Sequence, residues 1–100
     1  MKTRAFCATL FAASIAYGMA SSVYATEMRP IEWGINRPGE DLNHYGLVRN
    51  DATLCQDDCA GNQQCRAWVY TEDTNTCWLK KAVPGAVVRD KTAAGVKTVQ

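Results

Sequence analysis

Several residue types are scarce in this chain, and their scarcity excludes whole classes of chemistry. Residues 26–100 contain no serine, and His44 is the only histidine in the chain. A serine–histidine catalytic pair is therefore excluded from residues 26–100, and a cysteine nucleophile would have only His44 as its base. We interpret His44 as a surface or half-buried packing residue. No other set of residues forms a catalytic constellation, so we expect no enzymatic activity.

A strong charge of one sign is also lacking. The chain has 11 basic and 10 acidic residues; removing Lys2 and Arg4 with the N-terminal segment described next leaves nine basic residues and a net charge of −1. Nucleic acids and anionic membranes are bound by clustered basic surfaces. We therefore expect neither as a partner.

Only one long apolar run is present, and it lies near the N-terminus. Lys2 and Arg4 precede residues 5–20, which are almost all apolar or small, and residues 21–25 supply the small side chains of a cleavage site. The run of about 16 residues is shorter than the ~20 that cross a bilayer. Residues 1–25 are therefore predicted to be a cleaved secretory signal peptide. We expect export to the periplasm or the medium, without membrane insertion after cleavage.

The remaining residues, 26–100, are enough for a single domain. A domain of this size buries little surface and usually needs covalent cross-links. Cys7 is removed with the predicted signal, and four cysteines remain: Cys55, Cys59, Cys65 and Cys77. In an exported chain, four cysteines indicate two disulfide bonds.

Two other uses of cysteine fit the spacing poorly. Structural zinc sites favour closely spaced pairs such as C-x2-C, whereas three, five and eleven residues separate the successive cysteines here. The C-x-x-C pair of redox enzymes is absent. We therefore expect no metal and no cofactor.

One helix is predicted, over residues 52–62. Asn50 or Asp51 offers a side-chain oxygen to cap its first free amides, and Gly61 lies near its end. Around it, alternating patterns predict strands at residues 28–36, 65–71, 77–80 and 94–99.

Three further segments complete the predicted architecture. Residues 42–48 are ambiguous, and residues 81–90 are predicted to be a loop with a short extended piece at residues 87–88. In the first predicted strand, Ile31, Trp33 and Ile35 share one face. The predicted fold class is α+β, with one helix packed on an antiparallel β-sheet.

Four cysteines permit three pairings. A direct Cys55–Cys59 bond is disfavoured because it would distort a helical turn. Both remaining pairings join the helix to the hairpin. We favour the nested pairing, Cys55–Cys77 with Cys59–Cys65, because Cys59 lies near the helix end and only a short turn precedes Cys65.

Aromatic and basic residues on the strand after the helix form a candidate binding face. The predicted ligand-binding residues are Arg66, Trp68, Tyr70 and Lys80. The first three lie on the strand face opposite Cys65, and aromatic rings beside basic groups suit a sugar or a protein hot spot. Two alternatives remain open. The rings pack under the loop at residues 81–90, or the face assignment is reversed and they face the helix.

At these residues the chain resembles the PAN/apple family. The similar segments are residues 36–42, Cys55-x3-Cys59, Cys65-Arg-Ala-Trp-Val-Tyr70, Cys77-Trp-Leu-Lys80 and Gly95-Val96-Lys97. They occur in the family's order and span roughly residues 31–99. The resemblance implies a curved antiparallel sheet cradling one helix, with helix–hairpin disulfides consistent with the nested pairing. The extra cysteine pair of the longer apple type is absent, so the chain resembles the compact four-cysteine bacterial form.

The resemblance also implies a function. Members of the family bind proteins or carbohydrates and are rarely catalytic by themselves. Ligand sites vary between members, so the motif assigns no binding residue. We therefore predict a non-catalytic exported module that mediates protein–carbohydrate or protein–protein interaction. The alternative is a small structural or inhibitory subunit that docks on a periplasmic or envelope enzyme.

Overall fold

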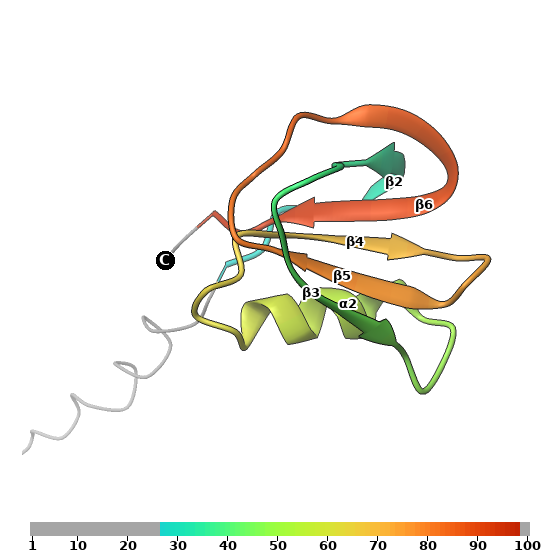
Figure 1. Ribbon diagram of the computed structural model, residues 1–100, viewed down its shortest axis with the longest axis horizontal. Coiled ribbons are helices and arrows are strands. Elements are labelled where there is room, and N and C mark those ends of the chain that lie inside the picture. The colour runs from blue at the N-terminus through green and yellow to red at the C-terminus, as the bar shows by residue number, and fades with distance from the viewer. Residues whose placement is uncertain (1–26, 99–100) are drawn as a thin grey trace, which may run out of the picture.

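The computed structural model describes residues 27–98, so the predicted signal peptide at residues 1–25 lies outside the described part. The described part contains one helix and five strands (Figure 1). In chain order they are β2 (Glu32–Asn36), β3 (Asp41–Gly46), α2 (Ala52–Ala60), β4 (Ala67–Thr71), β5 (Thr76–Lys80) and β6 (Val87–Val96). The predicted α+β class is confirmed.

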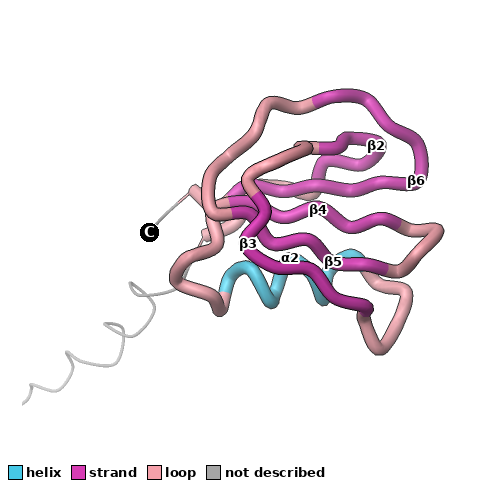
Figure 2. The backbone as a smooth tube through the Cα atoms, in the orientation of Figure 1, coloured by secondary structure: helices cyan, strands magenta, loops and turns pink. Residues whose placement is uncertain are grey.

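The strands form one antiparallel sheet in the order β2-β6-β4-β5-β3. Helix α2 lies along one face of this sheet, where it contacts β4 and β5 (Figure 2). The helix begins after Asp51, whose carboxylate accepts a hydrogen bond from the Thr53 amide at 3.0 Å. This is the capping predicted for Asn50 or Asp51. The helix ends at Ala60, two residues before the predicted end.

The core lies between α2 and the sheet. Its buried members come from the helix, from the segment before β4, and from β4, β5 and β6: Ala52, Cys55, Cys59, Cys65, Trp68, Tyr70, Cys77, Leu79 and Ala93. Four of these nine residues are the cysteines, and none of the four has exposed surface. The disulfides therefore occupy the positions that larger apolar side chains fill in bigger domains.

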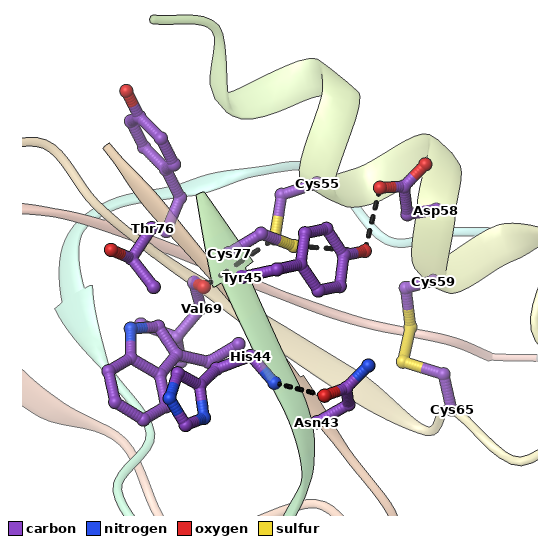
Figure 3. Close-up of a disulfide and its surroundings, with 12 residues drawn as sticks. Asn43, His44, Tyr45, Cys55, Asp58, Cys59, Cys65, Val69, Thr76 and Cys77 are labelled. Carbon is purple, nitrogen blue, oxygen red and sulfur yellow. Dashed lines mark hydrogen bonds between the residues drawn. A yellow bond between two sulfur atoms is a disulfide. The ribbon is translucent and has the colours of Figure 1, made fainter. Parts of the chain in front are cut away.

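Both disulfides follow the nested pairing. Cys55–Cys77 joins α2 to β5, and Cys59–Cys65 joins the end of α2 to the segment before β4 (Figure 3). Each closes a Cα–Cα distance of 5.3 Å. The predicted architecture of one helix tied to one hairpin by two disulfides is confirmed.

Strand β2 departs from the predicted alternation. Ile31 and Ile35 are half-buried, but Trp33 is 69% exposed. Gly34 has a φ of +75°, and the pairing with β6 shifts register between Trp33 and Ile35. A glycine at positive φ inside a strand is typical of a bulge, and a bulge re-aims the neighbouring side chains. The bulge lies between Trp33 and Ile35, so the predicted alternation of the three residues on one face is interrupted after Trp33.

Strand β6 is longer than predicted. Residues 87–96 form one bent strand instead of a loop followed by a closing strand. Its second half pairs with both β4 and β2, and its first two residues pair with β2 alone. Lys91, with a φ of 56°, lies at the bend, which Figure 1 shows as a sharp curve at one end of the sheet. Most of the ambiguous segment at residues 42–48 belongs to the edge strand β3, which ends at Gly46.

Within residues 27–98, no helix has both the length and the apolar character required to cross a membrane.

Arg37, directly after β2, forms an ion pair with Glu32 at the start of the strand and a hydrogen bond to the loop before β6. The Arg37 guanidinium donates to both carboxylate oxygens of Glu32 at 2.9 Å and to the Pro84 carbonyl at 2.6 Å. Its side chain is only 14% exposed. This bidentate geometry is the strong form of the interaction, and it adds a fixed orientation to the attraction.

Glu32→Gln is expected to reveal how this pair depends on pH. The hydrogen bond from Arg37 holds the pKa of Glu32 below its ordinary value. A carboxyl whose pKa is lowered by folding stabilises the protein above its unfolded-state pKa, and this contribution is lost as the pH falls through its folded-state pKa. The wild type should therefore exceed Glu32→Gln in unfolding free energy by at most about 1 kcal/mol at neutral pH. The difference should vanish in acid.

Urea denaturation at neutral pH and well below the ordinary glutamate pKa of about 4.3 measures both differences. Glu40→Gln is the control, because the Glu40 side chain is exposed and forms no ion pair with any residue of the described part. A Glu32→Gln difference of the same size at both pH values would contradict the proposed contribution of the ion pair.

Candidate binding site

The residues predicted to bind ligand do not form one open surface. Trp68 has no exposed surface, and Tyr70 and Lys80 are only 5% and 3% exposed. Trp68 and Tyr70 belong to the core cluster beneath α2, whereas Arg66 is half-buried just before β4. Of the two alternatives left open by the sequence, the structure shows the reversed face. The expectation of an open face bearing both rings is wrong.

The reversal has a simple cause. Strand β4 begins at Ala67, so Cys65 lies outside it and the period-two alternation does not extend back to the cysteine. Cys65 reaches the core from a turn, and Trp68 and Tyr70 reach the same core from the strand. The opposite face of β4 therefore carries Val69 and Thr71.

A cavity of about 210 Å³ opens beside the exposed ring of Trp33 and is called the Trp33 cavity here. Its lining comes from β2, from β6 and from the end of β4: Trp33, Gly34, Tyr70, Glu72, Lys91, Thr92 and Ala93. Tyr70, one of the predicted ligand-binding residues, thus contributes to this cavity although most of its surface is buried. The bulge at Gly34 and the bend at Lys91 bring these groups together.

Hydrogen bonds hold Tyr70 and Glu72, two of the residues that line the Trp33 cavity, in place. The Tyr70 hydroxyl donates to Asn75 Oδ1 at 2.8 Å, and burial, with the nearby Glu72 carboxylate, raises the pKa of this phenol. The Glu72 amide donates to the Lys91 carbonyl at 2.9 Å, which fixes the rim. Within residues 27–98, neither the Glu72 carboxylate nor the Lys91 ammonium forms an ion pair. Both charges are therefore available to a ligand.

A wider and more polar groove of about 810 Å³ lies between α2 and β3. Polar side chains dominate its lining, among them Asn43, Tyr45, Asp57, Asp58 and Asn62. The Tyr45 hydroxyl donates to Asp58 Oδ2 at 2.7 Å (Figure 3). Burial, and then this hydrogen bond, raises the pKa of the Tyr45 phenol. Tyr45 thus links the edge strand to the helix, which is a structural role.

His44 points away from that groove. Its exposed imidazole stacks on the half-buried indole of Trp78, with ring centroids 4.5 Å apart and an interplanar angle of 19°. No ion pair joins it to a carboxylate of the described residues. Residues 27–98 also hold no cluster of three side chains suited to binding a metal ion.

Sequence reasoning missed Trp33 as a candidate contact. Its place between two isoleucines in an alternating segment predicted only that the three residues share one strand face. No local signal marks its exposure, which follows from the position of β2 at the edge of the sheet. Lys91 was missed because it lies between the predicted loop at residues 81–90 and the predicted closing strand at residues 94–99, so no element was assigned to it.

Comparison with known families agrees with this architecture. The family model of the PAN domain matches residues 35–80, a range that includes α2, the β4–β5 hairpin and all four disulfide-bonded cysteines. No curated protein matches the chain. The matched cysteines form the two disulfides that hold the helix on the sheet, as the resemblance at these residues implies. This region of the chain, residues 35–80, is therefore a PAN domain.

Proposed function

We propose that this protein is a non-catalytic exported module that binds a saccharide in the Trp33 cavity. PAN domains usually mediate protein or carbohydrate interactions, which supports the general role. Two buried disulfides are typical of proteins in oxidising compartments, which supports export. The observation that carries the saccharide proposal is the Trp33 indole, 69% exposed at the mouth of a cavity with polar walls.

The chemistry of the cavity suits a sugar ring. The apolar face of a pyranose packs against an exposed indole, and its hydroxyls need donors and acceptors around the edge. Glu72 accepts hydrogen bonds, Lys91 donates them, and Thr92 does both. The cavity of about 210 Å³ is smaller than the ~300–1,000 Å³ typical of pockets for drug-sized ligands. It therefore fits one sugar ring, with the rest of a glycan outside.

The same lining argues against hydrolysis of the bound sugar. Glycosidases generally place two carboxyl groups on either side of the scissile bond. Glu72 is the one carboxylate among the described residues that line the Trp33 cavity. Binding without turnover is the role that this lining supports.

Trp33→Ala is expected to weaken saccharide binding by at least tenfold without lowering the unfolding temperature. Aromatic anchors at binding hot spots contribute about 2 kcal/mol or more, which exceeds a tenfold change in affinity. The protein purified after export, with its disulfides intact, would first be screened on a glycan array. Calorimetry with the best sugar would then compare the wild type and the variant.

Val48→Ala provides the matched control, because Val48 is another exposed apolar residue, at 89%, and does not line the cavity. Equal sugar affinity in Trp33→Ala and the wild type would refute the Trp33 cavity as the site. If no glycan on the array binds, the proposal that the ligand is a saccharide is refuted. Mass spectrometry of the same preparation tests cleavage after Ala25.

Docking on an envelope enzyme is the second candidate function. It is favoured by two exposed apolar residues at the start of β6, Val87 at 48% and Val88 at 85%. Exposed apolar side chains contribute to protein contacts, and these two valines, adjacent in a strand, offer one side chain to each face of β6. A complex that survives gel filtration and is lost in Val88→Asp would support this function over sugar binding.

A further inference from the structure

We propose a second binding site, on the sheet face opposite α2, for a sugar that carries a carboxylate. A cavity of about 200 Å³, called the Trp78 cavity here, lies on this face. Its functional groups come from β2, β3, β4, β5 and β6: Asn36, Asp41, Thr71, Trp78, Lys80 and Arg89. None of them lines the Trp33 cavity, so the proposal does not depend on the one above.

An oriented indole forms part of the cavity wall. Trp78 Nε1 donates to Thr71 Oγ1 at 3.3 Å, and the His44 imidazole stacks on the ring. The indole is thus held by contacts at its edge and at its face. A ring fixed in this way costs little conformational entropy when a ligand packs against it. The exposed part of the ring offers an apolar surface beside the Thr71 hydroxyl and the Asn36 amide.

The charges around the cavity favour an anion. Lys80 is only 3% exposed, and its ammonium pairs with the half-exposed carboxylate of Asp41. Arg89 is exposed and forms no ion pair with any residue of the described part. The cavity thus holds two cations, Lys80 and Arg89, and one carboxylate, that of Asp41. Since Lys80 pairs with Asp41, the Arg89 guanidinium is the cation left without an anionic partner. A planar carboxylate is the ligand group that matches its fork of donors.

The cavity wall is formed before any ligand arrives. The turn that carries Pro38 and Gly39 is tied to the segment after β5, because the Lys81 amide donates to the Glu40 carbonyl at 2.9 Å. Arg37 ties the same turn to the Pro84 carbonyl. A wall fixed at both ends, with the indole and the Lys80–Asp41 pair also held in place, lowers the entropy cost of binding one ring.

The three tryptophans allow a direct test, because each lies in a different environment. Trp78 lines the proposed site, Trp33 lines the other cavity, and Trp68 is fully buried. The exported protein, labelled with nitrogen-15, would be titrated with glucuronate, glucose, acetate and sulfate. The three indole N–H signals would be followed after assignment with Trp33→Phe and Trp78→Phe.

Glucuronate is expected to shift the Trp78 signal at concentrations at which glucose, acetate and sulfate do not, while the Trp68 signal stays in place. Arg89→Ala should weaken this binding at least tenfold, since a charge-assisted hydrogen bond is among the strongest single contacts. Arg49→Ala, which removes an exposed arginine from outside the cavity, should bind like the wild type.

Three results would overturn the proposal. An equal shift of Trp78 by acetate or sulfate would mean a simple anion site with no sugar recognition. A glucuronate shift confined to Trp33 would place acidic sugars in the other cavity. Unchanged glucuronate affinity in Arg89→Ala would remove the guanidinium from the site. If sugars fail to bind in the Trp33 cavity but glucuronate still shifts the Trp78 signal, the proposal for the Trp78 cavity is supported and only the proposed function of the Trp33 cavity is refuted.

Discussion

Replacing Cys55 and Cys77 together with alanine is expected to lower the free energy of unfolding by about 3 kcal/mol. The bond between them closes a sequence separation of 22 residues, and the chain-entropy model assigns a loop of this length roughly 3 kcal/mol. Small domains have total stabilities of only about 5–15 kcal/mol. Loss of this bond should therefore remove a large part of the stability of the protein.

The Cys59–Cys65 bond supplies the internal comparison. It spans six residues, and the same model assigns it about 2 kcal/mol, so Cys59→Ala with Cys65→Ala should be the milder double variant. Urea denaturation of both variants and the wild type measures the two losses on one scale. The single variant Cys55→Ala should also unfold more easily, because it leaves a free thiol in the core.

Two outcomes would contradict the proposed role of these bonds. If Cys55→Ala unfolds at the same urea concentration as the wild type, the disulfides are not the main cross-links of the core. If the two double variants lose equal stability, loop length does not set the effect, and packing of the sulfur atoms dominates instead. In either case the protein must be compared at the same concentration and without reductant.

The disulfide framework was predictable because its determinants are local. The three-residue gap between Cys55 and Cys59 puts both on one helix face, and the short turn before Cys65 limits what Cys59 can reach. Asp51 marks the helix start by the ordinary chemistry of capping. The β4–β5 hairpin follows from two alternating segments around one polar turn. Each of these inferences needs only neighbouring residues.

The direction of the aromatic side chains was not predictable in the same way. The face that Trp68 occupies depends on which residue begins β4, and a shift of one residue reverses every side chain in a strand. Trp33 lies opposite the core residue Ala93 but is exposed, because β2 is an edge strand and α2 packs on β4 and β5 instead. The pairing of β2 with β6 joins residues 51 to 62 positions apart, so no local pattern in the sequence predicts it.

The residues of the candidate binding sites also differ in whether local sequence or the tertiary fold determines their neighbours. Lys80 and Tyr70 were named from local composition, and they contribute to two different cavities. Arg89 and Lys91 were missed, because they acquire their neighbours only when β6 bends across the sheet. A binding role for Arg66 stays a prediction. The composition of a segment thus identified side chains that suit ligand binding, whereas the order and bending of the strands determined which of these side chains line the same cavity.

Gly95→Ala is expected to cost about 3 kcal/mol, at the upper end of the range for an overpacked core. Gly95 pairs with Trp68 across β6 and β4, and the indole lies over the glycine. An added Cβ would lie 2.5 Å from Trp68 Cε2 and 2.7 Å from Cζ2. The tryptophan has no exposed surface, so it cannot move away without disturbing the helix above it.

Gly85→Ala is the matched control, since a Cβ added there would meet no atom within 4 Å and Gly85 is exposed. Urea denaturation should find this control within about 0.5 kcal/mol of the wild type. In the background of Trp68→Leu, which is itself destabilising, Gly95→Ala should cost much less because the clashing ring is gone. An undiminished cost in that background would show that Gly95 is required by the backbone of β6. A diminished cost would establish that the size of the indole dictates glycine at this position.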